Sequence, residues 1–182
     1  MFVPEIRFCD SNDIPALLEL NSASSCPWPD SVITGDLDPN ADVGITYIGA
    51  FATSPGAMML GYAVLGREAK QGAKTGLLMG LTVHPEYRRR GIGSQLLAAA
   101  GDCAVYLGFK RMRLRVRRSN AAAFALYSSM SFAQDGVNRG YYSNGEDAIL
   151  MSARLPNPNR SRTQDSIAAL SSTRFNSSSS AS

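Results

Sequence analysis

The chain has 182 residues, of which 45% are hydrophobic and 18% are charged, so it can form one hydrophobic core of about 100 to 150 residues with an appendage. Its 18 Lys and Arg against 15 Asp and Glu leave a formal net charge of only +3. A charge this small excludes a general electrostatic attraction to nucleic acid or to an anionic membrane. Any anion must therefore be bound by a local basic cluster.

The cysteines and the hydropathy pattern indicate a protein that is neither exported nor inserted into a membrane. Cys9, Cys26 and Cys103 lie far apart, and an odd number cannot close a complete disulfide framework. A reducing cytoplasm is the simplest compartment for them. The sequence contains no apolar run of about 18 residues, and acidic residues interrupt the N-terminal region where a signal peptide would need a basic start and an apolar run.

The clearest boundary lies near the C-terminus. Pro156 and Pro158 follow the last apolar segment, and Ser, Arg and Asn dominate the residues beyond them. Such a composition cannot bury enough apolar surface to offset the entropy lost on ordering. The sequence therefore predicts one domain over residues 1–155 and a disordered tail over residues 156–182.

The first half of the domain is predicted to contain strands and one early helix. Asp13-Ile14-Pro15 is a typical helix start, and the prolines around Trp28 predict an irregular loop. A turn is expected at 54–56. Strands are expected over 5–8, 45–53, 58–65 and 75–83.

A basic, glycine-containing loop connects the last of these strands to a helix that ends near Leu107. Its sequence, from residue 88 to 94, is Arg-Arg-Arg-Gly-Ile-Gly-Ser. Unpaired amides and the helix dipole make such a helix start an anion site, and a pyrophosphate is the natural occupant. The spacing fits neither the dinucleotide fingerprint nor the P-loop. Alternatively, the arginines are a solvated helix entry and the glycines only shape a turn.

The second half of the domain is predicted to contain three strands and a helix. Strict alternation over 111–117 predicts a strand with apolar side chains on one face and four arginines on the other. Ser119 or Asn120 is expected to cap the helix that follows, over about 121–130. A final hairpin is expected over 134–142 and 147–155, with a turn at 143–146.

These motifs, in this order, resemble those of the GNAT N-acetyltransferases. The segment 81–93, Leu-Thr-Val-His-Pro-Glu-Tyr-Arg-Arg-Arg-Gly-Ile-Gly, is similar to the family's acetyl-CoA-binding motif in its Arg/Gln-x-x-Gly-x-Gly form. The Pro27-Trp28 loop and the segments 116–127, 140–142 and 146–151 resemble the RimI branch, which acetylates the N-terminal alanine of ribosomal protein S18. The resemblance covers nearly the whole chain except the tail.

The resemblance implies an α/β protein with the GNAT fold. In this fold a mixed sheet of about seven strands, flanked by about four helices, is splayed around acetyl-CoA between the strands over 77–83 and 111–116. Acetyl-CoA is the co-substrate and no metal is expected. The backbone amides of Leu81 and Val83 would hold the pantetheine and polarise the thioester carbonyl. The residues assigned to acetyl-CoA are Leu81, Thr82, Val83, Arg88, Arg89, Arg90, Gly91, Ile92, Gly93, Ser94 and Asn120.

The resemblance also assigns residues to the chemistry and to the acceptor. Tyr127 matches the family's general acid, which gives a proton to the departing thiolate; periodicity alone would make it an ordinary core aromatic residue. Tyr141 and Tyr142 match a tyrosine pair that lines the peptide site, although consecutive tyrosines at a strand end commonly straddle a sheet. His84, the only histidine, matches a position without a catalytic role.

One position departs from the family. RimI-type enzymes carry a general-base glutamate in Leu-Glu-Val-Arg, whereas this chain has Leu114-Arg115-Val116-Arg117, and a guanidinium cannot accept a proton. An α-amine with a reference pKa of about 7.7 to 8 is already partly neutral near pH 7.5. The charge of Arg115 would lower that pKa further, and we expect the proton to leave through water to solvent, to His84 or to Glu146.

The sequence therefore predicts an acetyl-CoA-dependent N-acetyltransferase that acts on a protein N-terminal α-amine. A ribosomal protein such as S18 is the expected partner, and neither nucleic acid nor a membrane is expected to bind directly. Two alternatives stay open, namely acetylation of a small-molecule amine and, because of Arg115, non-catalytic binding of acetyl-CoA.

Overall fold

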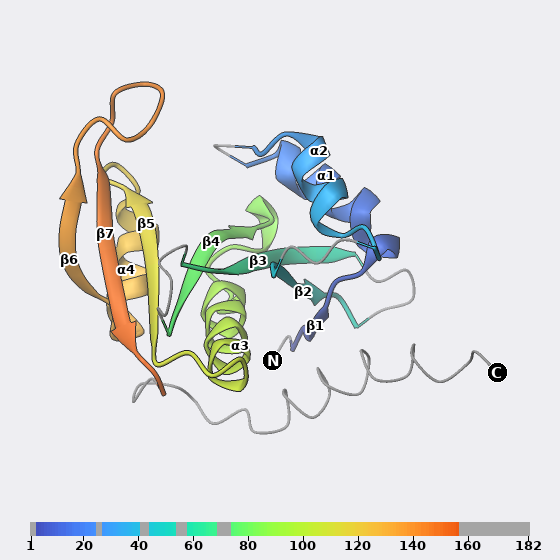
Figure 1. Ribbon diagram of the computed structural model, residues 1–182. Coiled ribbons are helices and arrows are strands. Elements are labelled where there is room, and N and C mark those ends of the chain that lie inside the picture. Colours follow the sequence, from blue (N-terminus) through green and yellow to red (C-terminus); the bar gives the residue numbers. More distant parts are fainter. Residues whose placement is uncertain (1–2, 25–26, 41–43, 54–57, 69–73, 157–182) are drawn as a thin grey trace.

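The computed structural model describes residues 3–24, 27–40, 44–53, 58–68 and 74–156, which form one seven-stranded mixed sheet with helices on both faces (Figure 1). The strand order is β1-β2-β3-β4-β5-β7-β6. The strands are β1 (Glu5–Phe8), β2 (Thr46–Phe51), β3 (Met59–Arg67), β4 (Thr75–Val83), β5 (Arg111–Arg117), β6 (Ala133–Asn138) and β7 (Ala148–Arg154). The helices are α1 (Ile14–Ser22), α2 (Asp30–Asp36), α3 (Ile92–Tyr106) and α4 (Ala121–Ser129), with 3-10 turns at Ser11–Asp13 and Pro85–Tyr87.

The predicted order of elements is confirmed, and β4 and β5 have the predicted bounds. The sequence analysis missed α2, which lies where only a loop was expected. This helix is one short segment after Pro29, and Ile33 is its only buried residue. A helix with a single buried side chain has no apolar stripe, so its sequence carries no periodic signal.

The predicted final hairpin is wrong in the extent of its first strand. β6 ends at Asn138 rather than at Tyr142. Gly140 adopts a positive φ of 58°, and its N–H donates to the Asp147 carboxylate at 3.0 Å instead of joining the ladder. The predicted turn is the tip of a longer loop, in which the Tyr142 N–H donates to the Glu146 carbonyl at 3.1 Å.

Some predictions lie outside the described residues, namely the turn at 54–56, the position of Cys26, and the tail after Pro156. Within the described ranges, Cys9 and Cys103 are buried free thiols. No helix in those ranges has both the length and the apolar composition that a bilayer crossing requires.

Each face of the sheet has its own core. On one face, α3 buries Leu96 and Ala100 completely against the strands. On the other face, Leu17 of α1 and Ile33 of α2 pack against a cluster that includes Tyr47. Because both faces of β2 and β3 are covered, packing from two sides fixes the position and direction of these two strands.

β4 and β5 pair only over their first halves. The last parallel pair joins Leu78 to Leu114. At the same place the register of β4 against β3 shifts, since Val64 lies opposite Gly80 while the next residue of β3 lies opposite Leu78. Met79 is therefore an extra residue, and such a bulge bends and twists its strand. Beyond it the two strands diverge, as Figure 1 shows, and leave an opening in the sheet.

The close approach of β3, β4 and α3 requires a glycine at position 61. A Cβ on Gly61 would lie 2.7 Å from the Thr82 carbonyl oxygen and 3.0 Å from the Leu96 Cδ1 atom. We expect Gly61→Ala to lower the free energy of unfolding by about 1–3 kcal/mol through overpacking, as measured by urea denaturation. Gly35→Ala in α2 is the control, because nothing lies within 4 Å of its Cβ position. Equal midpoints for Gly61→Ala and the parent protein would contradict this account.

Candidate active site

The opening between β4 and β5 contains a cavity of about 190 Å³. Its described lining contains two arginines but no Asp, Glu or His. In the described part of the chain, no three His, Cys, Asp or Glu side chains gather to hold a metal ion. The lining residues are Asn21, Ser24, Trp28, Tyr62, Leu78, Met79, Gly80, Leu81, Thr82, Arg115, Val116, Arg117, Asn120, Ala123, Tyr127 and Tyr142.

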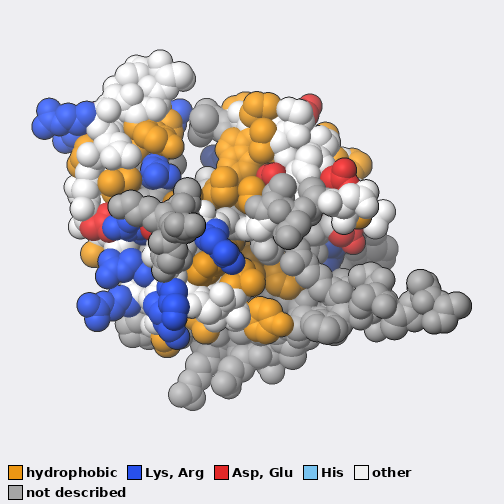
Figure 2. Space-filling model, in the orientation of Figure 1, with side chains coloured by type: hydrophobic (Ala, Val, Ile, Leu, Met, Phe, Trp, Pro, Cys, Tyr) orange, Lys and Arg blue, Asp and Glu red, His pale blue; other side chains and the backbone are white. Residues whose placement is uncertain are grey.

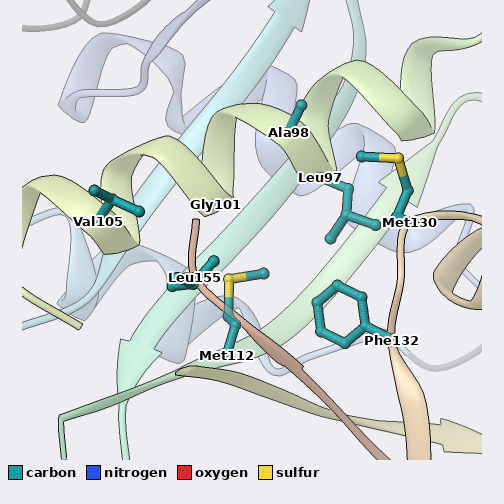
Figure 3. Close-up of a pocket in the computed structure, with 8 residues that line it drawn as sticks. All are labelled: Leu97, Ala98, Gly101, Val105, Met112, Met130, Phe132 and Leu155. Carbon is teal, nitrogen blue, oxygen red and sulfur yellow. The ribbon is translucent and has the colours of Figure 1, made fainter. Parts of the chain in front are cut away.

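A second hollow lies between α3 and the strands and differs in character. Figure 3 shows that apolar side chains of α3, β5 and the segments around Met130 and Leu155 surround it. Its volume is about 10 Å³, which is room for about one water molecule. It has neither the size nor the polar groups for a substrate, so the cavity between β4 and β5 is the candidate active site.

The predicted backbone donors lie on the open edge of β4. The His84 N–H donates to the Leu60 carbonyl of β3 at 2.8 Å. Successive backbone groups of an antiparallel strand point to alternate sides, so the N–H groups of Leu81 and Val83 point away from β3 and toward the opening. The ladder to β5 has already ended at Leu78. These two amides are therefore available to a ligand carbonyl.

The predicted phosphate loop forms the N-terminus of α3. Gly91 is its N-cap and adopts a φ of 81°, which an L side chain rarely adopts. A glycine is favoured at position 93 for a different reason, since a Cβ there would lie 3.2 Å from the Leu126 Cδ2 atom of α4. One glycine thus shapes the turn, and the other brings α3 close to α4. The conformation of Gly91 agrees with the alternative in which the glycines shape a turn.

The three arginines of this loop are exposed and have distinct contacts. The Arg88 Nε donates to the Val83 carbonyl at 3.1 Å, which ties the loop to the end of β4. The Arg90 guanidinium lies 5.0 Å from the centre of the Tyr87 ring, and Arg89 has a positive φ of 62°. Three cations at a helix start with unpaired N–H groups fit a pyrophosphate.

Asn120 is the N-cap of α4, which decides between the two predicted caps. Its side-chain oxygen accepts from the Ala123 N–H at 3.0 Å. Because the oxygen is used in this way, the amide NH₂ group is the part of Asn120 that can donate to a ligand in the cavity.

Tyr127 packs in the core and also lines the cavity. The residue is only 7% exposed, and its ring packs against Phe132 with 6.0 Å between ring centres. Burial, with a smaller contribution from Tyr142, raises the pKa of the Tyr127 phenol to about 12. The phenol therefore carries its proton at neutral pH and can act as a donor.

The predicted tyrosine pair is divided between two environments. Tyr142 lines the cavity, and its ring centre lies 3.8 Å from the Arg117 guanidinium. Tyr141 is 51% exposed and does not belong to the described lining. Its ring is perpendicular to that of Tyr142 and lies 5.4 Å from the Arg115 guanidinium. Tyr142 is a wall of the cavity, whereas Tyr141 supports an arginine of the wall.

Neither of the side chains named as proton acceptors lines the cavity. The His84 Nδ1 accepts from the Glu86 N–H at 3.3 Å, and its ring lies against Tyr87. Glu146 pairs with Arg117 at 3.1 Å. Hydrogen bonds from the Ser119 hydroxyl and N–H, together with Arg117, lower the pKa of Glu146 to about 2. A carboxylate held by these partners is a weaker base than a free one, which disfavours Glu146 as the proton acceptor.

The wall opposite β5 depends on Asn21, which the sequence analysis missed. Asn21 is 2% exposed and makes two hydrogen bonds with the Trp28 backbone, of 2.9 and 3.0 Å. The Tyr62 hydroxyl donates to the same side chain at 3.3 Å. Trp28 in turn lies against β4, where a Cβ on Gly80 would be 3.3 Å from its ring. The sequence did contain a signal for this role. Asn21 lies four positions after Leu17 in α1 and therefore on the same apolar face of the helix.

Comparison with known proteins identifies the family. The model of the acetyltransferase (GNAT) family matches residues 24–132. The chain belongs to the GNAT acetyltransferase family. It is an N-acetyltransferase, and enzymes of this family use acetyl-CoA.

By their names, two relatives are a ribosomal-protein alanine N-acetyltransferase and an N-alpha-acetyltransferase. The [ribosomal protein bS18]-alanine N-acetyltransferase of Escherichia coli (strain K12) is 29% identical over 150 residues, which cover 80% of this chain and 94% of that protein. An N-alpha-acetyltransferase of Sulfurisphaera tokodaii is 42% identical over 84 residues, which cover 45% of this chain and 50% of that protein.

A solved structure confirms the predicted fold. The crystal structure of the ribosomal-protein-S18-alanine N-acetyltransferase from Escherichia coli superposes with a TM-score of 0.70 at 26% identity. The match covers 84% of this chain and 94% of that chain. The seven-stranded mixed sheet with four helices is therefore the GNAT fold, as expected.

Trp28 is the only tryptophan of the chain, so its fluorescence reports on the wall of the cavity. We expect Asn21→Ala to shift the Trp28 emission to the red and to increase its quenching by acrylamide, because both anchoring hydrogen bonds are lost. Stability should fall by about 1–3 kcal/mol, since partly buried backbone groups of Trp28 lose their partner. The exposed Asn12→Ala is the matched control. An unchanged spectrum for Asn21→Ala would show that other contacts hold the loop.

Proposed function

We propose that this N-acetyltransferase modifies the α-amine of a protein N-terminus, with a ribosomal protein such as S18 as a candidate acceptor. The observation that carries the proposal is a single cavity that Tyr127 lines and whose two sides have different groups, backbone amides on one side and aromatic side chains on the other. One side is the open edge of β4, and the other contains Trp28 and Tyr142. The likeness to the S18-alanine N-acetyltransferase over 80% of the chain supports it. We assign the reaction to the cytoplasm, where ribosomal proteins are made.

In this proposal the acetyl donor binds along β4 and the start of α3. The amides of Leu81 and Val83 donate to the pantetheine and to the thioester carbonyl, where negative charge develops during the attack. Fixed donors aimed at that oxygen stabilise the transition state. The amides of residues 89–94 and the side chains of Arg88, Arg89 and Arg90 hold the pyrophosphate. Asn120 donates to the donor molecule from the start of α4.

Tyr127 is the proposed general acid. The departing thiolate needs a proton, and a phenol with a pKa of about 12 still carries one at neutral pH. A positioned proton donor of this kind typically accelerates a reaction by about 10² to 10⁴. The ring is buried and lies against Phe132, which limits where the hydroxyl oxygen can be placed.

The chain carries out the reaction without a side-chain base in the described lining of the cavity. The attacking amine must therefore be neutral when it arrives. An α-amine has a reference pKa of about 7.7 to 8 and a lysine amine about 10.4, so at neutral pH the α-amine has much the larger neutral fraction. The positive charge of Arg115 lowers the pKa of a nearby amine further. This favours α-amines, with the proton leaving through water.

The proposal is tested with a peptide that has an N-terminal alanine and an internal lysine. The peptide is incubated with acetyl-CoA and the protein, and fragmentation mass spectrometry locates the added acetyl group. We expect it on the α-amine and not on the lysine. Transfer to lysine alone would contradict the proposal, as would turnover with polyamines or aminoglycosides and none with peptides.

We expect Tyr127→Phe to lower kcat by about 100-fold or more, because the thiolate loses its proton donor. Acetyl-CoA affinity, measured by calorimetry, should stay the same, since the ring remains in place. Tyr106→Phe is the matched control, because Tyr106 is 65% exposed at the end of α3.

The pH profile gives a second readout for Tyr127. A raised pKa means that the proton is retained up to strongly alkaline pH, so the rate of the parent enzyme should not fall as pH passes 10, the usual pKa of tyrosine. An equal kcat for Tyr127→Phe and the parent protein would assign the residue to the core alone.

A further inference from the structure

We propose that the acceptor is an acidic N-terminus, that is, a peptide with Asp or Glu at or next to its first residue, and that Arg115 selects it. This inference rests on the proposed function and specifies the substrate class of the same site. It starts from the charges that the fold leaves at the acceptor side of the cavity.

The arginines on the exposed face of β5 differ in their partners. Arg113 pairs with Glu68 at 2.9 Å, and Arg117 pairs with Glu146 at 3.1 Å. Arg115 lies between them on the same face and lines the cavity. Among the described residues, no carboxylate lies within 4.0 Å of its guanidinium. The charge of Arg115 is therefore not compensated from within the described part of the protein.

The surroundings of Arg115 leave its hydrogen-bond donors available. Its guanidinium lies 5.4 Å from the Tyr141 ring centre, and a cation–π contact of this kind leaves the N–H groups at the guanidinium edge available. Tyr141 is held by the perpendicular ring of Tyr142, at 5.1 Å. An arginine supported by a ring in this way can bind a carboxylate with two parallel hydrogen bonds.

The acidic groups that contact this face of β5 pair with other arginines, since Glu68 and Asp135 contact Arg113 and Glu146 contacts Arg117. The cross-strand neighbour of Arg115 on β7 is Leu150. The opposite wall contains the neutral side chains of Asn21, Trp28 and Tyr62. On the face seen in Figure 2, basic side chains gather on the side formed by β5, β6 and β7, whereas acidic ones lie mainly on the side of α1 and α2. A basic peptide is therefore repelled from the β5 side, and an acidic one is attracted.

The test compares three peptides that begin with alanine and differ only at the second residue, which is Glu, Gln or Lys. CoA release gives kcat/KM, and mass spectrometry verifies that the α-amine is the site of transfer. We expect the order Glu, Gln, Lys, with a difference of about three- to tenfold at each step, mostly in KM. The differences should shrink at 0.5 M salt, because the charge of Arg115 is exposed and screened.

Variants of Arg115 assign the preference to this side chain. Arg115→Gln should remove the preference, Arg115→Glu should reverse it in favour of the Lys peptide, and Arg115→Lys should retain it in part. Arg154→Gln is the matched control, because it removes the same charge from an exposed position at the far end of β7. Circular dichroism melting of each variant establishes that it is folded.

The outcomes separate the two proposals. Equal kcat/KM for the three peptides, or a preference that survives Arg115→Gln, would overturn the inference about Arg115 and leave the N-terminal acetyltransferase proposal intact. Failure of the parent protein to acetylate any of the peptides at the α-amine would overturn both. A preference that changes with Arg115 and not with Arg154 would establish acidic selection.

Discussion

The candidate active site exists because β4 and β5 stop pairing after Leu78 and Leu114. The outer partners of both strands continue, since β3 pairs with β4 up to Val83 and β7 pairs with β5 up to Arg117. The two open edges are thus held apart by a paired and packed sheet and not by loops. Backbone donors on such a frame are oriented before any ligand arrives, which is the condition for efficient electrostatic stabilisation.

Parts of this frame can be predicted from the sequence because their signals are local. The bounds of β4 and β5 follow from apolar runs and from strict alternation, and the start of α3 follows from the glycine loop. The opening between β4 and β5 was predicted only from the resemblance to the family and not from the residues themselves. The bulge at Met79 has no local signal, because it is defined only by the register against β3. Register is a property of two segments, and one segment alone does not determine it.

The acceptor side was the least predictable part for the same reason. Asn21 holds the Trp28 loop and also accepts from Tyr62, which is 41 positions away along the chain. Similarly, the role of Glu146 is set by Arg117 and Ser119, which lie on other elements. Glu146 was predicted as a proton acceptor from its chemistry, but the partners that the fold supplies lower its basicity. For Arg115, by contrast, the residue type alone was enough to indicate that this position lacks the general base of RimI-type enzymes.

The open ends of β4 and β5 are also strand edges inside a folded molecule. Exposed edges accept strands from other chains and so initiate aggregation, and proteins oppose this with charged side chains on the edge. Arg115 and Arg117 stand on the β5 edge of the opening, and Trp28 and Tyr142 line the same cavity. The same cations that give this side of the cavity its charge are therefore also of the kind that opposes strand addition at an edge. Replacing both by neutral residues would remove that opposition together with the charge.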